Sequence, residues 1–406
     1  MADLSRRFLT AAGLGLVGTA RAQEAPKIEL PPVEQPGGAD QPIPNPDPVG
    51  RRLGVAVVGI GHLSLEQILP GFGQARHVKL AALVSGDPAK ARTVAAQYGV
   101  PDTHVYDYAG FDRLRDNADV DIVYIVLPNA MHAEYTVRAA QAGKHVLCEK
   151  PMATSVADAE HMVASCKAAG RKLMIAYRMQ YNPFHRFLIG AVRDKSYGNL
   201  RAIFAANGQN QVKSPPQWRH DLRMAGGGSL VDVGIYCFNA ARYITGEEPV
   251  AVQASLTRPT DDPRFKQVED VCNFTLRFPS GVVAQMQSGY SHHETRLLHV
   301  MTENATISMD PAFAYQGLRM TVARKDGNSA STDARRFPER NQFATEMDAF
   351  AEAIRANKEP LTPGEEGTQD MRVIAAIYQA AEGGGTVKLP EVKGLDTTRG
   401  PAPTQS

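Results

Sequence analysis

Two segments of the sequence combine residue types that can hold and move a proton. Lys150 follows a short apolar run, residues 145–148, and precedes Pro151. Asp232 and Tyr236 lie four positions apart, which places a carboxylate and a phenol on the same face of a helix. A phenol has a pKa of about 10, and a nearby ammonium group lowers it toward that of a useful general base. We therefore predict Lys150 and Tyr236 as catalytic residues, with Asp232 assisting.

The helix that carries Asp232 and Tyr236 has a clear predicted start. Three glycines, residues 226–228, precede Ser229, a residue type that often caps a helix N-terminus. A purely structural explanation stays open. Asp232 would then favour the helix dipole, and Tyr236 would lie at the edge of the core. Lys150 would in that case be a surface lysine paired with Glu149.

A second group of residues has the pattern of a dinucleotide-binding loop. The apolar run 54–58 leads into Gly59-Ile60-Gly61-His62-Leu63-Ser64, and a helical stretch follows. The first glycine permits a tight turn, the second lets the backbone approach a pyrophosphate, and the helix N-terminus supplies N–H donors. Ser64 replaces the third glycine of the usual fingerprint. Any turn from strand to helix favours glycine, so the loop alone is weak evidence for a nucleotide.

The next strand ends at residues that bear on the choice of cofactor. An NAD-specific pocket usually has a carboxylate at this strand tip, but Ser85 stands there. A hydroxyl, together with Lys90 one turn into the following helix, suits a 2′-phosphate, so we predict NADP. In the alternative, Ser85 only caps the helix and Lys90 is solvated. The nearby Asp87 argues against the NADP assignment.

Further candidates lie at later strand ends and before the glycine-rich turn. Residues 127–129 follow the run 122–127 and lead to His132, and strand ends of this kind face the nicotinamide. His132 also fits a packing or capping role. Trp218 and Arg219 suit a stacking surface with donors for sugar hydroxyls, or a hydrophobic anchor beside a surface arginine. The predicted nucleotide contacts are Gly59, Gly61, His62, Leu63, Ser85, Lys90, Leu127, Asn129, His132, Glu149, Lys150, Arg178, Trp218 and Arg219.

The order of the predicted elements indicates an α/β fold with two domains. Strands at 54–58, 79–84, 122–127, 145–148 and 173–176 alternate with helices at 88–98, 130–142 and 156–169. This alternation predicts a Rossmann domain with a doubly wound parallel sheet over residues 51–176. Consecutive strands at 200–208, 250–258, 271–278, 282–290, 297–302 and 318–324 follow. They predict a C-terminal α+β domain with a large, mostly antiparallel sheet over residues 177–390. Helices at 343–355 and 369–381 close the fold, and a tail spans 391–406.

The N-terminus has the pattern of an export signal. Paired arginines, Arg6 and Arg7, precede an apolar run at residues 11–20 and a small-residue cleavage site. We predict a twin-arginine signal peptide over residues 1–22, and export of the folded protein to the periplasm. The run is shorter than the about 20 residues of a membrane-spanning helix, so no stable membrane anchor is expected. Residues 23–50 are rich in proline, and form either a disordered spacer or an arm across a neighbouring subunit.

The net charge and the cysteines indicate which kinds of ligand the protein binds. A net charge of +1 argues against a nucleic-acid binder that works through a basic field, so a small molecule is the expected partner. The four cysteines, Cys148, Cys166, Cys237 and Cys272, lack the spacing of metal ligands. We predict no metal site and buried, unpaired cysteines, although an oxidising compartment leaves a disulfide open.

Taken together, the sequence resembles the glucose-fructose oxidoreductase branch of the sugar oxidoreductase family that includes inositol dehydrogenase. The similarity covers nearly the whole chain, from the leader and the arm to Pro363-Gly364-Glu365-Glu366-Gly367. The shared feature of the family is the lysine of Glu149-Lys150-Pro151. Tyr236 is more discriminating, because much of the wider family has histidine there. His62-Leu63-Ser64 departs from the Lys-Tyr-Ala expected in this branch.

The resemblance implies a function. By it, Lys150 and Tyr236 are catalytic and Asp232 assists them. Ser85 and Lys90 contact a 2′-phosphate, and Trp218 and Arg219 lie near the adenine or in an active-site lid. The branch holds NADP tightly between half-reactions, and the arm takes part in that retention and in the contacts of a homodimer or homotetramer. The implied reaction oxidises an aldose to its lactone and reduces a second sugar, a ketose or an aldose, in a ping-pong cycle. The alternatives are a dehydrogenase that exchanges free NAD(P) and a sugar-binding relative without turnover.

Overall fold

A parallel six-stranded sheet organises the first part of the computed structural model, which describes residues 50–211 and 213–392. Its order is β3-β2-β1-β4-β5-β6, and every neighbouring pair is parallel. The strands are β1 (Leu53–Val58), β2 (Val78–Val84), β3 (Val105–Tyr106), β4 (Ile122–Ile125), β5 (His145–Cys148) and β6 (Leu173–Ile175). The predicted leader, the arm as far as residue 49 and the tail from residue 393 lie outside the described residues.

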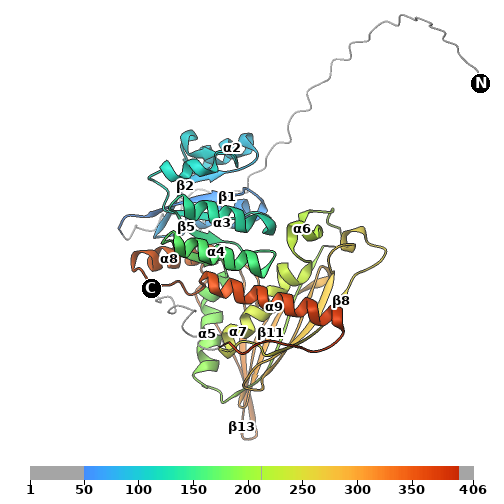
Figure 1. Cartoon of the computed structure of the whole chain (residues 1–406). Coiled ribbons are helices and arrows are strands. Elements are labelled where there is room, and N and C mark those ends of the chain that lie inside the picture. Colours follow the sequence, from blue (N-terminus) through green and yellow to red (C-terminus); the bar gives the residue numbers. More distant parts are fainter. Residues whose placement is uncertain (1–49, 212, 393–406) are drawn as a thin grey trace, which may run out of the picture. The chain divides into compact units, whose positions relative to one another are not determined.

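Helices and short turns connect these strands. The helices are α1 (Leu69–Gly71), α2 (Pro88–Tyr98), α3 (His132–Gln141) and α4 (Val156–Ala168), with short turns η1 (Ser64–Ile68), η2 (Asp102–His104), η3 (Phe111–Asp116), η4 (Asn129–Met131) and η5 (Arg178–Tyr181). α3 and α4 pack side by side (Figure 1). The strand order reverses between β1 and β4, so the crevice at their carboxyl ends is where such folds bind ligands.

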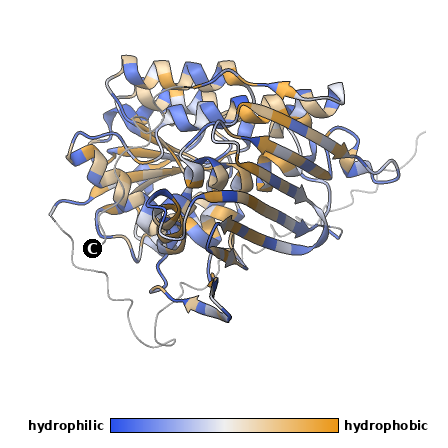
Figure 2. Ribbon diagram, turned by 90° about the horizontal axis from the view of Figure 1, so that it is seen from below, coloured by the Kyte–Doolittle hydropathy of each residue, from blue (hydrophilic) through white to orange (hydrophobic). Residues whose placement is uncertain are grey.

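A nine-stranded sheet forms the second part, in the order β14-β13-β12-β11-β7-β10-β9-β8-β15. Only the β7–β10 pair is parallel among the described strands of this sheet. Hydrophobic and hydrophilic segments alternate along these strands (Figure 2). The strands are β7 (Leu200–Asn210), β8 (Ala251–Thr257), β9 (Val271–Arg277), β10 (Val283–Gly289), β11 (Ser291–Thr302), β12 (Ala305–Met309), β13 (Met320–Asp326), β14 (Ser329–Arg335) and β15 (Val387–Lys388).

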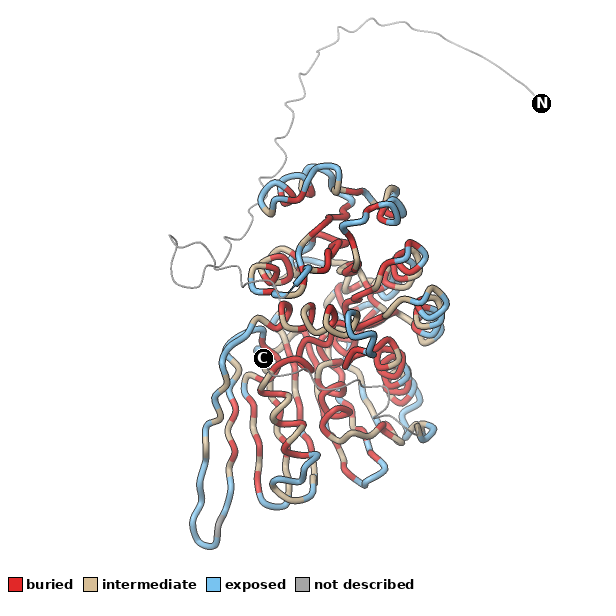
Figure 3. The backbone as a smooth tube through the Cα atoms, turned by 90° about the vertical axis from the view of Figure 1, so that its left-hand side faces the viewer, coloured by how far each residue is buried: buried red, intermediate tan, exposed pale blue. Residues whose placement is uncertain are grey.

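The helices of the second part join the two sheets. They are α5 (Pro183–Arg193), α6 (Leu222–Ala225), α7 (Ile235–Thr245), α8 (Gln342–Arg355) and α9 (Gly364–Gly383), with turns η6 (Trp218–His220), η7 (Leu230–Gly234) and η8 (Pro263–Phe265). α7 packs on β7 and β10, and α9 contacts both α4 and β8. α8 returns to the first part, where it contacts η1, α1 and β2. Figure 3 shows the strands of the parallel sheet largely buried, whereas buried residues alternate with less buried ones along strands of the second sheet, and β14 is largely exposed.

The structure confirms the predicted fold class, a Rossmann sheet followed by a large and mostly antiparallel sheet. The predicted bounds of α2 and β5 agree with the structure residue for residue. All four cysteines are buried and unpaired. Within the described ranges, no helix is both long enough and apolar enough to cross a membrane.

Candidate active site

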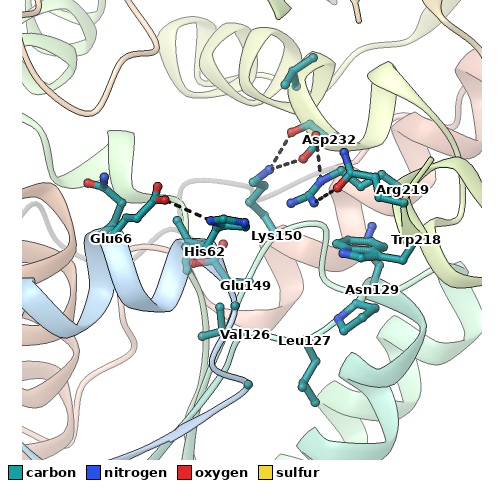
Figure 4. Close-up of a pocket in the computed structure, with 18 of the residues that line it drawn as sticks. His62, Glu66, Val126, Leu127, Asn129, Glu149, Lys150, Trp218, Arg219 and Asp232 are labelled. Carbon is teal, nitrogen blue, oxygen red and sulfur yellow. Dashed lines mark hydrogen bonds and ion pairs between the residues drawn. The ribbon is translucent and has the colours of Figure 1, made fainter. Parts of the chain in front are cut away.

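One cavity of about 760 Å³ collects every residue that the sequence predicts as functional. It lies where the carboxyl ends of β1, β2, β4 and β5 meet the strands and turns of the second sheet, and Figure 4 shows part of its wall. The predicted residues that line it are Gly59, Gly61, His62, Leu63, Ser85, Lys90, Leu127, Asn129, His132, Glu149, Lys150, Arg178, Trp218, Arg219, Asp232 and Tyr236.

The glycine loop forms one wall and requires glycine for steric reasons. Gly59 has a φ of +95°, and a Cβ there would lie 2.2 Å from the carbonyl oxygen of Val126. At Gly61 a Cβ would meet no atom within 4 Å, so this glycine leaves its side of the cavity open. Ser64 is buried, and its Oγ donates to the carbonyl of Gly59 at 2.6 Å. The serine that replaces the third glycine therefore closes the loop, and the loop keeps the open backbone that a pyrophosphate needs.

His62, the other departure from the expected pattern, points away from the loop. Its side chain is 97% exposed, and its Nδ1 lies 3.1 Å from a carboxylate oxygen of Glu66, one turn along the chain (Figure 4). His62 thus lies at the rim of the cavity, and its side chain closes none of the space beside Gly61.

Asp87, which also lines the cavity, caps the N-terminus of α2. Its carboxylate accepts hydrogen bonds from the backbone N–H groups of Ala89 and Lys90 at 3.1 and 3.0 Å. Ser85 is buried, and its Oγ accepts from the N–H of Asp87 at 3.1 Å. The carboxylate that could favour NAD is therefore used as the N-cap of α2, so the alternative in which Ser85 caps the helix is wrong. Ser85 and Lys90 both remain at the cavity wall.

Asp232 holds two cations at the centre of the cavity. The Lys150 Nζ donates to the Asp232 carbonyl at 2.6 Å and lies 3.5 Å from its Oδ1. The Arg219 Nε lies 3.2 Å from Asp232 Oδ2, so the two cations meet the carboxylate from different sides (Figure 4). Burial alone would raise the pKa of Asp232, but the charges of Arg219 and Lys150 and a hydrogen bond from Tyr290 lower it to about 2. The alternative of a surface pair between Lys150 and Glu149 is wrong.

Two cations lie close to the ring of Tyr236. The Lys150 Nζ is 4.7 Å from the centre of its ring, and the Arg178 guanidinium carbon is 5.0 Å from the same point. Arg178 is buried and is fixed by the carbonyls of Phe313 and Ala314, to which it donates at 2.8 and 3.2 Å. Both cations therefore make cation–π contacts with the Tyr236 ring.

The tips of β4 and β5 are tied together by His132. The ring is fully buried, and its two nitrogens lie 2.9 and 2.8 Å from the carbonyl oxygens of Pro151 and Leu127. Burial lowers the pKa of this imidazole. The neighbouring Asn129 donates to the carbonyl of Ala225 at 2.8 Å and so links the first part to α6. His132 and Asn129 therefore hold the strand tips in place around the cavity.

The start of the helix that carries Asp232 differs from the prediction. Ser229 makes no capping hydrogen bond, and its Oγ instead lies 3.0 Å from the Oγ of Ser288. The N–H groups of Gly228 and Leu230 donate to the buried carboxylate of Glu269 at 3.0 and 2.8 Å. The predicted cap is wrong because a carboxylate from a distant segment occupies this position. The helix also begins with the π-helical turn η7, which keeps both Asp232 and Tyr236 at the cavity.

The chain matches known proteins over both parts of this architecture. Residues 53–177 match the model of the oxidoreductase family with an NAD-binding Rossmann fold, and residues 185–308 match the GFO/IDH/MocA C-terminal domain. A D-xylose 1-dehydrogenase of Haloarcula marismortui, whose name specifies NADP(+), is 31% identical over 340 residues, which cover 82% of this chain and 92% of that protein. The chain belongs to the GFO/IDH/MocA oxidoreductase family.

Two further relatives of this oxidoreductase illustrate the range of the family. The crystal structure of aldose-aldose oxidoreductase from Caulobacter crescentus, complexed with glycerol, superposes with a TM-score of 0.80 at 47% identity, covering 84% of this chain and all of that one. A dTDP-3,4-didehydro-2,6-dideoxy-alpha-D-glucose 3-reductase of Streptomyces violaceoruber is 30% identical over 312 residues, 75% of this chain and 86% of that protein.

Several residues of this oxidoreductase's cavity were missed by the sequence analysis. Tyr290 is buried at the end of a predicted strand, and its hydroxyl donates to Asp232 at 2.8 Å. The amides of Gln209, in β7, Gln211, which follows β7, and Gln217, which precedes η6, also line the cavity. Hydrogen bonds from Gln211 to Gln209 and from Gln217 to Gln211 join the three amides. Among the described residues no cluster of side chains suits a metal ion.

Proposed function

We propose that this oxidoreductase is a periplasmic enzyme that oxidises an aldose to its lactone and reduces a second sugar to a polyol, with NADP kept bound throughout. The observation that carries the proposal is the position of Tyr236, close to both Lys150 and Arg178 in the cavity that the tips of β4 and β5 also line. The 47% identity to an aldose-aldose oxidoreductase supports the same substrate class.

The proposed proton transfers use the chain's own side chains. Tyr236 takes the proton of the anomeric hydroxyl and returns it to the carbonyl oxygen of the second sugar. Lys150 and Arg178 stabilise the negative charge that the phenol oxygen acquires. Asp232 holds Lys150 and Arg219 in place and, with a pKa of about 2, stays ionised. A nicotinamide dinucleotide, when bound, supplies the acceptor and donor of the hydride.

Retention of the nucleotide and export are supported by the sequence. A twin-arginine leader carries folded proteins, and an enzyme that closes its own redox cycle needs no supply of free nucleotide outside the cytoplasm. The proline-rich arm, residues 23–50, is proposed to cross a neighbouring subunit of a homodimer or homotetramer. Light scattering on protein with and without these residues tests the arm, since loss of the arm is expected to lower the molecular mass.

The central experiment uses the purified mature protein without added cofactor. Denaturation is expected to release NADP in about one equivalent per chain, as a site that does not exchange its ligand requires. The native protein is then incubated with glucose alone, and with glucose and fructose, and the products are analysed for lactone and polyol. Absence of bound nucleotide, with turnover only when free NAD(P) is added, would instead identify a dehydrogenase that exchanges its cofactor. The name of the Haloarcula relative favours that second candidate.

Replacing Ser85 with aspartate is expected to reverse the cofactor preference. The new carboxylate would repel a 2′-phosphate but could accept hydrogen bonds from the ribose hydroxyls of NAD. We expect the affinity for NADP relative to NAD to fall by about tenfold, or about 1.4 kcal/mol. The Kd values of both nucleotides for stripped protein check this.

The control for this change is Ser85→Ala, which removes the hydroxyl and adds no charge. This variant is expected to bind NADP more weakly and still prefer it over NAD. An equal loss of affinity for both nucleotides in Ser85→Asp would contradict the assignment of Ser85 to the 2′-phosphate.

A further inference from the structure

A pair of buried carboxyl groups interacts with Lys150 and Arg178. Glu149 follows β5 and is 7% exposed, and Glu346, on α8, is 0% exposed. The hydroxyl of Tyr124, a buried residue of β4, lies 2.8 Å from Glu149 Oε1 and 3.1 Å from Glu346 Oε1. The backbone N–H of Lys150 also hydrogen-bonds to the Glu149 carboxylate. Glu149 is thus connected to the segment that carries Lys150, and Glu346 is connected to Glu149 through Tyr124.

The hydrogen count of this cluster requires a proton beyond that of Tyr124. A phenol has one hydrogen, so it can donate to one carboxylate only. If both glutamates were ionised, the Tyr124 hydroxyl could donate to one of them only. Its oxygen would then face an oxygen of the other glutamate with no hydrogen between the two atoms. A proton on Glu346 removes the conflict, because Glu346 then donates to Tyr124 and Tyr124 donates to Glu149. The second oxygen of Glu346 is buried and has no partner among the described residues, which an ionised carboxylate tolerates poorly.

We propose that Glu346 carries a proton at neutral pH and acts as a positioning residue, which fixes Glu149 through Tyr124 and thereby holds Lys150 beside Tyr236. The effect on turnover rests on the proposed function, whereas the protonation does not. Burial raises the pKa of Glu346 well above its ordinary value, the charge of Glu149 adds to this, and burial also raises the pKa of Glu149. Arg178 opposes the shift in both glutamates.

The charged groups around the pair determine what loss of the proton would do. The charge of Arg178, in η5, acts on both glutamates, and the charge of Lys150 acts on Glu149. Tyr181, also in η5, interacts with Glu346. Tyr236 and Tyr315 interact with Arg178 and Lys150. An ionised Glu346 would add a second negative charge behind Arg178 and Lys150 and would draw both away from the Tyr236 ring. Activity is therefore expected to fall at alkaline pH as this proton is lost.

The test compares wild-type protein with Glu346→Gln, which is neutral at every pH, and with Glu352→Gln, a control on the same helix whose carboxylate pairs with His77 at the surface. Infrared spectra at neutral pH are expected to show the C=O stretch of a protonated carboxylic acid that Glu346→Gln lacks and Glu352→Gln keeps. Because the folded state binds this proton more tightly than the unfolded chain, the contribution of Glu346 to wild-type stability falls as pH rises above 4.5. Glu346→Gln is expected to lose part of that slope, and Glu352→Gln to keep it.

The turnover measurement addresses the positioning role. Between neutral and alkaline pH, Glu346→Gln is expected to lose several-fold less activity than wild-type protein. Glu346→Met, which is neutral but cannot donate to Tyr124, is expected to turn over more slowly than Glu346→Gln at neutral pH. This variant also keeps the test usable if the glutamine variant fails to fold.

The measurements test the protonation of Glu346 and its positioning role separately. An unchanged infrared band and an unchanged stability slope in Glu346→Gln would overturn the protonation of Glu346. A lost band with an unaltered pH profile of turnover would overturn its positioning role. The infrared and unfolding measurements need no sugar, so they remain decisive if wild-type protein proves inactive on sugars, a result that would count against the proposed function alone.

Discussion

Replacement of Tyr236 by phenylalanine is expected to lower turnover by about 10²–10⁴-fold, the usual contribution of a general acid–base group. The variant is expected to keep its nucleotide, because the ring still packs against Phe313, 6.2 Å away between ring centres, and only the hydroxyl is lost. The measurement pairs the rate of sugar oxidation with the amount of nucleotide released on denaturation.

The size of this effect follows from the state of the other ionisable groups in the cavity. Asp232 accepts from Lys150, Arg219 and Tyr290, and its low pKa of about 2 removes it as a proton donor near neutrality. His132 has both ring nitrogens directed at backbone carbonyls. Burial disfavours the charged form of Lys150, but the charges of Tyr236 and Asp232 raise its pKa. Burial raises the pKa of Tyr315, a second phenol that lines the cavity, to about 12. Compared with these groups, the phenol of Tyr236 is the better candidate for the proton transfer.

Tyr243→Phe is the matched control for this prediction. Tyr243 lies on the same helix, α7, but its hydroxyl donates to the carbonyl of Leu361 at 3.1 Å, away from the cavity. Loss of this hydrogen bond is expected to cost about 1 kcal/mol of stability and to leave turnover unchanged. Turnover by Tyr236→Phe within a few-fold of wild type would remove the phenol from the proposed mechanism.

The fold was predictable where hydrophobic periodicity and turn chemistry agree. Five of the six strands of the parallel sheet are apolar runs that the sequence predicts, because strands of this kind are buried on both faces. The two-residue strand β3 was not predicted. β14 could not be found in this way, because its sequence Ser-Ala-Ser-Thr-Asp-Ala-Arg has no apolar face and most of its residues are exposed. It is a strand because it pairs with β13. Such strands follow from tertiary pairing, which a local pattern does not contain.

The candidate site was predictable in its residue types but not in its connections. Gly59, Lys150 and Tyr236 stand next to recognisable strand ends or glycines, so local sequence located them. The partners that orient them come from distant segments, such as Tyr290, which donates to Asp232, and Glu269, which caps the turn η7. The burial of Glu346 could have been predicted, because it lies on the apolar face of a predicted helix with Phe343, Met347 and Phe350. A charged residue in that position predicts a buried polar partner.

Replacement of Arg242 by methionine is expected to destabilise the protein by about 3–5 kcal/mol, because it leaves buried carboxylates without their counter-charge. The Arg242 side chain is 0% exposed and binds three carboxylates that are at most 2% exposed, those of Glu248, Glu366 and Asp370. These groups connect α7 to α9. The free energy of unfolding in urea, followed by circular dichroism, measures the loss.

The pH dependence of this loss distinguishes unpaired charge from lost packing. In the wild-type protein, burial raises the pKa of Asp370 from 3.8 to about 6, so the stability from this group decreases as pH rises between those values. The charge of Arg242 lowers the pKa of Asp370, so without Arg242 that pKa is expected to be higher still. The difference between Arg242→Met and wild type should therefore shrink as the pH is lowered from neutral, since protonation removes the uncompensated charges.

Two further variants test whether buried charge at Arg242, Glu248, Glu366 and Asp370 causes the loss of stability. Arg138→Met removes an arginine whose partners, Asp112 and Glu134, are 65% and 62% exposed, and its ion pairs are expected to contribute no more than about 1 kcal/mol. Adding Asp370→Asn to Arg242→Met removes one of the uncompensated charges and is expected to restore part of the lost stability. If the added change destabilises the protein further, the loss comes from packing and not from buried charge.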